Sequence, residues 1–328
     1  MMDRRQFAAG GLALVAATHA ACAQGGYPDR PIHILVGYSA GGGVDIVARL
    51  LGEPMKATLG QSVIVENRPG ASAMIAANAV AKAAPDGLTL LMVASGEVAI
   101  NQHLFKDKMP YDPARELTAV ALVGIVPCVI VVAATTPVHN AAELIAYARA
   151  NRGKLSFSSS GVGNQQQLAG ELMNSMAGTD VLHVPYRGSA PAVTDVATGA
   201  VTMSFSSLAA ALPLIRDGRI RAVAVTSRER MPQLPDVAPL AEAAPELKDY
   251  ELLNWFGLFA PAATPEPIVN RLNEIVAAGL RDPSIAEKLQ AQGIVPRIMT
   301  PAEYRAFVRA ETEKFGKIVA QANIRMEN

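Results

Sequence analysis

The sequence lacks the charge excess that proteins use to bind nucleic acids. It has 328 residues with 29 basic and 29 acidic side chains, so its formal net charge is zero. No run of Lys or Arg occurs beyond scattered pairs such as Arg4-Arg5. Nucleic-acid binders usually concentrate basic residues on one face because they must neutralise phosphates. We therefore expect no nucleic-acid partner.

Cysteine and long apolar runs are also scarce. The chain has two cysteines, Cys22 and Cys128. Cys128 lies in an apolar stretch of 15 residues, 120–134, which also contains Pro127. This stretch is too short to span a bilayer and predicts a buried pair of strands. Cys128 is expected to be a small buried hydrophobe within it.

The first 23 residues have the order of features found in an export signal. Arg4 and Arg5 precede a short apolar stretch, which ends at the small-residue site Ala21-Cys22-Ala23. "DRRQF" is similar to the twin-arginine consensus. We predict a signal peptide at 1–23, of twin-arginine or general secretory type, and a mature chain that begins at Gln24. Cys128 would then be the sole cysteine, which excludes an intramolecular disulfide.

The mature chain has about 305 residues, which favours two domains. Short runs rich in β-branched residues alternate with helical patterns, which predicts an α/β architecture. Eight runs are expected to form strands: "PIHILVG", "SVIVENR", "LTLLMVAS", "VIVVAAT", "KLSFSSS", "VLHVPY", "VTMSFSS" and "IRAVAVT". Helix starts are predicted at Asn140, with Glu143 three residues later, and at Thr300, with Glu303 three residues later.

A glycine-rich turn follows the first expected strand. Gly41-Gly42-Gly43 precede a helix that should begin near Val44. Free N–H groups and the helix dipole at such a turn attract an anion, and Asp45 could order the loop by accepting some of these groups. A tight turn that merely needs positive φ explains the glycines equally well, so both interpretations stay open.

A second turn of the same kind follows "KLSFSSS". Ser160 precedes the segment Gly161 to Asn164, which leads into another helix. Two such loops in two domains could face each other across a cleft, where open α/β proteins bind ligands. A dinucleotide remains an alternative because Asp180 follows Gly161 by 19 residues, although Gln166 stands where G-x-G-x-x-G needs its third glycine.

Catalytic and metal-binding patterns are weak. The mature chain has four histidines, none in metal-ligand spacing: His33, His103, His139 and His183. The serines before Gly161 have no base nearby in the sequence to activate them. Catalytic partners can meet in space, so an enzyme stays open as an alternative. We predict no enzymatic activity, no metal and no cofactor.

Five motifs in order give the chain a resemblance to a known family. It resembles the tripartite tricarboxylate transporter receptors, the Bug-type extracytoplasmic solute-binding proteins, over nearly the whole mature chain. The motifs are "YSAGGGVDIVARLL", "ENRPGASAMIAANAVAKAAPDGLTLLMVAS", "KLSFSSSGVGNQQQLAGELM", "HVPYRGSAPAVTDVATGAVTMSFSSLAAALPLIRDGRIRAVAVTS" and "WFGLFAPAATPEPIVNRLN". The resemblance implies a two-lobed periplasmic-binding-protein fold (Venus flytrap, type II), a periplasmic location, and a small carboxylate that is handed to membrane permease subunits.

The resemblance also implies the lobes and the site. The first lobe would comprise 24–125 and 251–328, and the second 126–250, with crossings near Val126 and Trp255. The loop 38–43 would hold one carboxylate, and the loop 159–164 would contribute from across the cleft. The residues that match the family pattern are Tyr38, Ala40, Gly41, Gly42, Asp45, Ser95, Ser160, Gly163 and Asn164.

Departures from the family pattern bear on the ligand. The family commonly has an acidic residue after the phenylalanine of "MSF", where this chain has Ser206. An ammonium group would lose a partner there, which favours a carboxylate without an amino group. A second carboxylate could use Arg187, although a solvated loop residue is an equal alternative. We expect a monomer. A sensor coupled to a signalling partner would have the same pocket, so that role stays open.

Overall fold

The computed structural model describes residues 26–322 and residue 324. The predicted signal peptide and its junction with Gln24 lie outside these residues. None of the helices within 26–322 has the length and apolar character needed to cross a membrane.

Ten strands form the centre of the molecule. They are β1 (Ile32–Val36), β2 (Val63–Asn67), β3 (Thr89–Val93), β4 (Leu117–Ala133), β5 (Leu155–Ser159), β6 (Val181–Pro185), β7 (Met203–Ser207), β8 (Ile220–Val225), β9 (Leu253–Pro261) and β10 (Val295–Pro296). Each of the first eight overlaps one of the eight predicted runs, and β4 begins 12 residues before its run. β9 and β10 were not predicted as strands.

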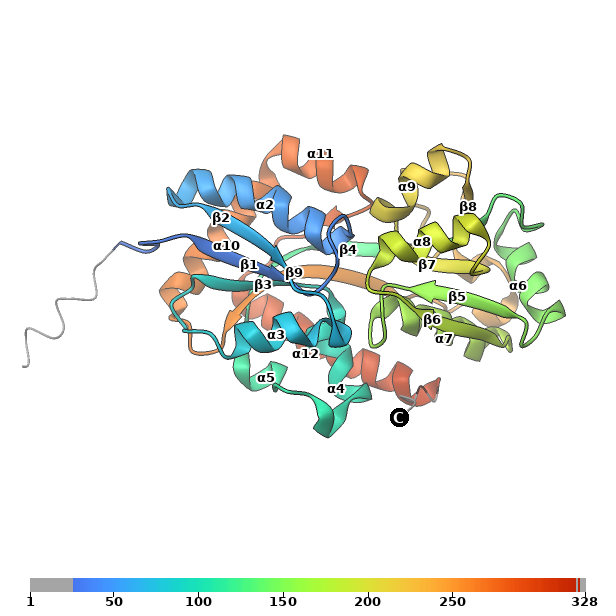
Figure 1. Cartoon of the computed structure of the whole chain (residues 1–328), viewed down its shortest axis with the longest axis horizontal. Coiled ribbons are helices and arrows are strands. Elements are labelled where there is room, and N and C mark those ends of the chain that lie inside the picture. The colour runs from blue at the N-terminus through green and yellow to red at the C-terminus, as the bar shows by residue number, and fades with distance from the viewer. Residues whose placement is uncertain (1–25, 323, 325–328) are drawn as a thin grey trace, which may run out of the picture.

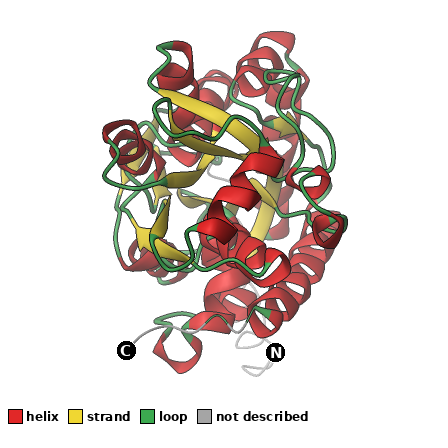
Figure 2. Ribbon diagram, turned by 90° about the vertical axis from the view of Figure 1, so that its right-hand side faces the viewer, coloured by secondary structure: helices red, strands yellow, loops and turns green. Residues whose placement is uncertain are grey.

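Helices flank the strands on the outside of the molecule (Figure 2). The longer ones are α2 (Gly43–Leu59), α3 (Met74–Ala81), α6 (Ala141–Ala150), α7 (Gln165–Ala177), α8 (Ser189–Thr198), α9 (Leu208–Arg216), α10 (Glu266–Arg281), α11 (Pro283–Ala291) and α12 (Pro301–Gln321). Single turns form α4 (Asn101–Leu104), α5 (Pro113–Glu116), the π-helix η2 (Gly96–Ile100), and the 3₁₀ helices η1 (Ala71–Ala73), η3 (Lys106–Lys108), η4 (Leu240–Glu242) and η5 (Pro245–Leu247).

The fold has two lobes, which confirms the predicted fold class. β1, β2 and β3 lie in the first lobe, and β5 to β8 lie in the second (Figure 1). β1 pairs in parallel with β2 and β3, and β5 pairs in parallel with β6 and β7. The C-terminal helices α10 and α12 return to the first lobe, where both contact β4. The residue boundaries given above for the lobes stay a prediction.

β4 joins the lobes, and it corrects the prediction of two buried strands in 120–134. It is one strand of 17 residues that pairs with β9 up to Pro127 and with β7 from Cys128 onward. Proline has no N–H to donate to a ladder, so a proline is expected where pairing changes. Pro127 lies where β4 changes partner, and the strand continues through it.

The helix signals read from the sequence are largely confirmed. Thr300 accepts from Glu303 N while the Glu303 side chain reaches back, a complete capping box at the start of α12. Asn140 accepts from Glu143 N at 2.9 Å and begins α6. Along α12, Tyr304 and Phe315 are fully buried. Trp255 is fully buried too, and its ring packs edge-on against Tyr304 and Phe307.

A carboxylic acid is buried in the core of the first lobe. Glu97, in η2, is fully buried and accepts a hydrogen bond from Tyr38 Oη at 3.0 Å. Its other oxygen, Oε1, has no partner within the described residues. Burial raises the pKa of Glu97 to about 8, and the hydrogen bonds from Tyr38 and the backbone offset this only in part. Glu97 therefore carries a proton at neutral pH.

Glu97→Gln should change how stability depends on pH. The unfolded chain loses this proton near pH 4.5 and the folded chain near pH 8, so the contribution of Glu97 to stability falls as the pH rises between these values. The Tm of Glu97→Gln relative to the wild type should rise from pH 4.5 to 8 and level off above. Thermal unfolding across this range is the measurement, with exposed Glu287→Gln as the control. If the Tm of the wild type and that of Glu97→Gln changed with pH in the same way, Glu97 would not be neutral in the folded protein.

Candidate ligand-binding site

The first glycine loop is held in shape by Asp45. Gly41 has a φ of 81° and donates its N–H to Asp45 Oδ2 at 3.0 Å. Arg49 and Asn67 Nδ2 also donate to this carboxylate, and Asn67 Nδ2 reaches the Tyr38 carbonyl as well. Burial raises the pKa of Asp45, but the bonds from Arg49, Gly41 and Asn67 outweigh it and leave the pKa lowered. Asp45 therefore stays ionised and holds the loop in place through these hydrogen bonds.

The second loop is held by amide side chains at the start of α7. Asn164 caps the helix by accepting from Gln167 N at 2.9 Å, and its Nδ2 donates to Ser160 Oγ at 2.9 Å. Gln166 accepts from Ser160 N at 2.7 Å and donates to Ser189 Oγ at 3.0 Å. The Ser160 and Ser189 oxygens therefore already accept a bond, and each hydroxyl proton is free to donate elsewhere.

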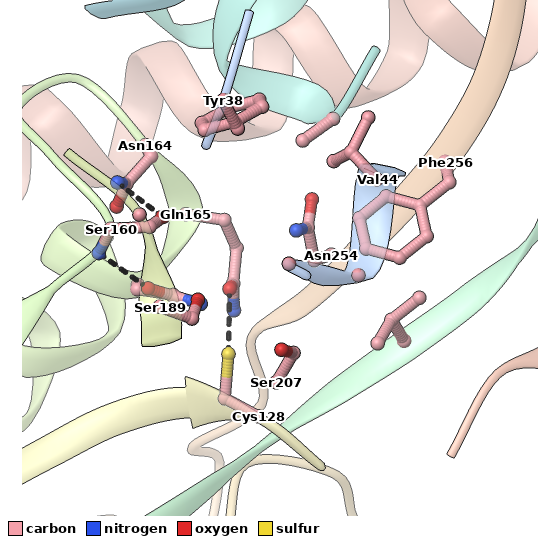
Figure 3. Close-up of a pocket in the computed structure, with 16 residues that line it drawn as sticks. Tyr38, Val44, Cys128, Ser160, Asn164, Gln165, Ser189, Ser207, Asn254 and Phe256 are labelled. Carbon is pink, nitrogen blue, oxygen red and sulfur yellow. Dashed lines mark hydrogen bonds between the residues drawn. The ribbon is translucent and has the colours of Figure 1, made fainter. Parts of the chain in front are cut away.

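The two loops meet at a cavity between the lobes (Figure 3). Its volume is about 30 Å³, enough for one or two water molecules, so the lobes must part for a larger ligand. Its walls come from both lobes and from the connecting strands. The lining residues are Tyr38, Gly42, Gly43, Val44, Ala94, Val126, Cys128, Ser160, Asn164, Gln165, Gln166, Gly188, Ser189, Ser207, Asn254 and Phe256.

The starts of four helices line this cavity. Gly42 precedes α2, Asn164 precedes α7, Gly188 precedes α8, and Ser207 precedes α9. The first N–H groups of a helix have no partner within the helix, and the dipole places partial positive charge there. No lining residue carries a charged side chain. The arrangement therefore favours an anion without supplying a formal cation.

Asn254 adds a donor that the sequence did not predict. Its Oδ1 accepts from Ser95 Oγ at 2.9 Å, from Ser95 N and from Trp255 N. These bonds fix the amide so that Nδ2 is the group left for the cavity, on the side that faces Gln165 (Figure 3). Ser95, which the resemblance to the family placed in the site, does not line the cavity and positions Asn254 through these two hydrogen bonds.

The remaining predicted residues surround the cavity without lining it. Ala40 and Gly41 are exposed on the first loop. Gly163 contacts the first lobe, where a Cβ would meet Asn101 Oδ1 at 2.2 Å. Arg187 lines a larger space of about 490 Å³ that also borders Tyr38, Ser160 and Asn164. Ser206 is fully buried and donates to the carbonyl of Ser207 at 3.2 Å.

A direct contact joins the lobes beside the cavity. Ser39 donates to the Arg187 carbonyl through Oγ at 2.8 Å and through its backbone N–H at 3.4 Å. Ser39 also lies in Gly37-Tyr38-Ser39-Ala40-Gly41, which has the G-x-S-x-G spacing of a nucleophile elbow. Its hydroxyl is occupied by a carbonyl, and no histidine contacts it within the described residues. The pattern therefore marks an interlobe contact.

Ser159 and His183 form a pair that could suggest catalysis. Ser159 Oγ lies 2.7 Å from His183 Nε2, but it donates its own proton to the Gly161 carbonyl at 2.7 Å. His183 must then donate to Ser159, so it does not act as a base. Burial lowers the pKa of His183 to about 4, in keeping with a neutral ring. Neither side chain lines the cavity, and the pair shapes the turn.

Ser189 is the first residue of α8, and Gly188 precedes it without a side-chain cap. Cys128 is buried as expected, yet it also lines the cavity and donates to Gln165 Oε1 at 3.0 Å. Burial raises the pKa of its thiol to about 12. The cysteine therefore stays neutral beside the anion site.

Comparisons with known proteins agree with this architecture. Residues 47–324 match the family described as "Tripartite tricarboxylate transporter family receptor". The chain is 38% identical over 322 residues to the "UPF0065 protein in tcbD-tcbE intergenic region" of Pseudomonas sp. (strain P51), covering 98% of this chain and 95% of that protein.

Two solved structures are similar throughout. "R. palustris Rpa4515 with adipate" is 36% identical with a TM-score of 0.88, covering 91% of this chain and 99% of that one. The "periplasmic binding protein BugD" is 33% identical with a TM-score of 0.85, and the match covers 92% of this chain and 100% of that one. These relatives are binding proteins, which confirms the prediction of a binding protein rather than an enzyme. With a family match that covers most of its length, the chain belongs to the tripartite tricarboxylate transporter receptor family, and the predicted resemblance is confirmed.

Proposed function

We propose that the chain is a receptor that captures a small organic carboxylate between its lobes. The observation that carries this proposal is the lining of the cavity, where hydroxyls, the Asn254 amide and four helix starts supply donors from both lobes. Each helix terminus contributes roughly 0.3–1 kcal/mol toward an anion when exposed, and more when partly buried. A ligand that touches both lobes also stabilises their closed arrangement.

The proposed ligand carries no amino group. No Asp or Glu side chain lines the cavity, so an ammonium group has no carboxylate to pair with. Ser206, where the family commonly has an acid, offers none either. The relative solved with adipate, a dicarboxylate, supports a ligand of this kind.

The proposed setting is the periplasm. Family membership and the export signal predicted at 1–23 support this location, and they support delivery to membrane permease subunits of a tripartite tricarboxylate-type transporter. The proposed roles of the predicted site residues fall into two groups. Four of them line the ligand site directly: Tyr38, Gly42, Ser160 and Asn164. Three shape the site from outside the cavity wall, namely Asp45, Ser95 and Gly163, and Arg187 lies at its mouth. We propose that the receptor acts as a monomer.

A panel of ligands tests the proposal on the purified mature protein. Mono-, di- and tricarboxylates and zwitterionic amino acids are compared by thermal shift. A carboxylate at a hundred times its Kd should stabilise the protein by about 2.7 kcal/mol, whereas amino acids should not shift the Tm. Selective stabilisation by an amino acid, or none by any carboxylate, would overturn the proposal.

Asn254→Asp should abolish carboxylate binding while the fold is kept. An aspartate still accepts the bonds from Ser95 and Trp255, but it turns a negative oxygen toward the ligand instead of an amide. Two unit charges about 4 Å apart repel by about 4 kcal/mol at an effective dielectric constant of 20, so Kd should rise by at least ~100-fold. Isothermal titration calorimetry measures this.

Asn270→Asp is the matched control, because it makes the same change of charge at an exposed position of α10. It should leave Kd unchanged. Equal affinities for Asn254→Asp and Asn270→Asp would show that Asn254 does not face the ligand.

A further inference from the structure

A buried acid is bonded to a residue of the cavity wall. Glu97 belongs to the π-helix η2, and its carboxyl accepts a hydrogen bond from Tyr38 Oη at 3.0 Å. Tyr38 itself lines the cavity. π-helices are rare, and they occur frequently at functional sites. One tyrosine side chain therefore separates Glu97 from the place proposed for the ligand.

A second set of bonds connects η2 to the cavity. Ser95 directly precedes η2, and its hydroxyl and backbone N–H both donate to Asn254 Oδ1. Asn254 lines the cavity. Gly96, the first residue of η2, packs against the second lobe, because a Cβ there would lie 3.0 Å from the Gly163 carbonyl oxygen. A change of charge within η2 would therefore act on the cavity through two connections.

The surroundings of Glu97 suit a neutral carboxyl group. Its side chain is fully buried, and Oε1 has no partner within the described residues. A buried carboxylate needs donors at both oxygens, because it has lost its hydration. Burial raises the pKa of Glu97 to about 8. Glu97 is thus neutral near pH 7 and becomes charged in mildly alkaline solution.

Three tyrosines approach Glu97, and none of them can neutralise a charge there. They come from the loop after β1, from the segment before α5 and from α12: Tyr38, Tyr111 and Tyr304. Burial raises the pKa of all three, so they stay neutral. His103 of α4 is directed to the carbonyl of Thr312 instead. β3 and η1 contain no titratable residue.

The charged residues of α5 and α12, the other helices that pack against η2, are exposed or paired elsewhere. The half-buried ones pair with Lys82, with Glu266 and with one another, and they are Glu116, Arg305, Glu311 and Lys314. None of them bonds to Glu97 within the described residues. An ionised Glu97 would therefore lack a counter-charge.

A carboxylate in the cavity and a negative charge on Glu97 would repel each other. The core between them has a lower dielectric constant than water, so like charges interact more strongly there. A bound ligand should thus hold the proton on Glu97 more tightly. Because coupling between two binding events is reciprocal, loss of this proton should weaken ligand binding equally.

We propose that Glu97 is a positioning residue for Tyr38 whose proton is linked to ligand binding: the receptor binds its carboxylate with Glu97 neutral, and binding weakens when Glu97 ionises. The proposal rests on the proposed function, because it takes the ligand to be an anion in the cavity. It assigns the pH range in which the receptor holds its ligand to a residue outside the cavity wall.

The experiment measures Kd by calorimetry on the purified mature protein from about pH 7 to about pH 9.5, with adipate, succinate and hexanoate as probes. All three acids are ionised throughout, because carboxyl groups titrate near pH 4 in water. The wild-type Kd should be constant below about pH 8 and rise by at least ~5-fold above it. The Cys128 thiol, which lines the cavity, ionises only near pH 12 and cannot cause this rise.

Glu97→Gln keeps the shape of the side chain but cannot ionise. Whatever its Kd at neutral pH, this value should not rise up to about pH 9.5. A merely structural role of Glu97 would change Kd by the same factor at every pH. Glu287→Gln removes an exposed carboxyl of α11 and is the control, which should keep the wild-type rise.

Proton uptake provides a measurement on the wild type alone. The binding enthalpy is compared in two buffers of different ionisation enthalpy, and binding should take up more protons at about pH 8.5 than at about pH 7. Thermal unfolding at each pH checks that the variants fold. If Glu97→Gln does not fold, this uptake decides the question, and no uptake would overturn the link.

A wild-type Kd that does not change with pH would overturn the link and leave the proposed function intact. The same rise in Glu97→Gln as in the wild type would also overturn it, because another group would then carry the proton. A wild type that binds none of the three acids at any pH would overturn both proposals.

Discussion

The starts of α2, α7, α8 and α9 converge on one cavity, and the rest of the site follows from this convergence. A helix start has partial positive charge but no side chain that must be desolvated. Four of them can stabilise an anion where a buried lysine or arginine would need a partner of its own. The cavity wall has no charged side chain, and this agrees with anion binding by helix starts. An Asp or Glu side chain in the wall would compete with the ligand for the same donors.

The convergence depends on how the strands connect the lobes. β4 runs through both lobes and changes partner from β9 to β7 at Pro127, next to Cys128 at the cavity. β9 carries Asn254 and Phe256 to the same place from the opposite direction. The residues between the lobes therefore do two things: they hold the lobes together and they form part of the cavity wall.

Local sequence predicted much of this structure. All eight predicted strands exist, and the caps at Asn140 and Thr300 are in place, because strand composition and capping act over a few residues. The length of β4 was not predicted, since Pro127 normally interrupts a strand and its tolerance depends on pairing with two lobes. The β9 strand contains Asn254, whose role depends on bonds to Ser95, 159 residues earlier in the chain.

The site residues also divide into those that the sequence predicted and those that depend on contacts between distant segments. Glycine loops before helices leave a local pattern, and the resemblance to the family placed Tyr38, Gly42, Ser160 and Asn164 in the site. Ser207 is the last residue of its strand and no glycine follows it, so nothing in the pattern distinguished it from Ser206. Their difference lies in which face of β7 each side chain occupies, and pairing with β4 decides that. Contacts between distant segments thus determine what the sequence alone left open.

The most direct test of the central claim is a crystal structure of the mature protein with a saturating small carboxylate. The account predicts carboxylate oxygens within hydrogen-bond distance of N–H groups at the starts of helices from both lobes, with Asn254 Nδ2 among the donors. A carboxylate bound outside this cavity, or held mainly by the Arg187 side chain, would contradict it.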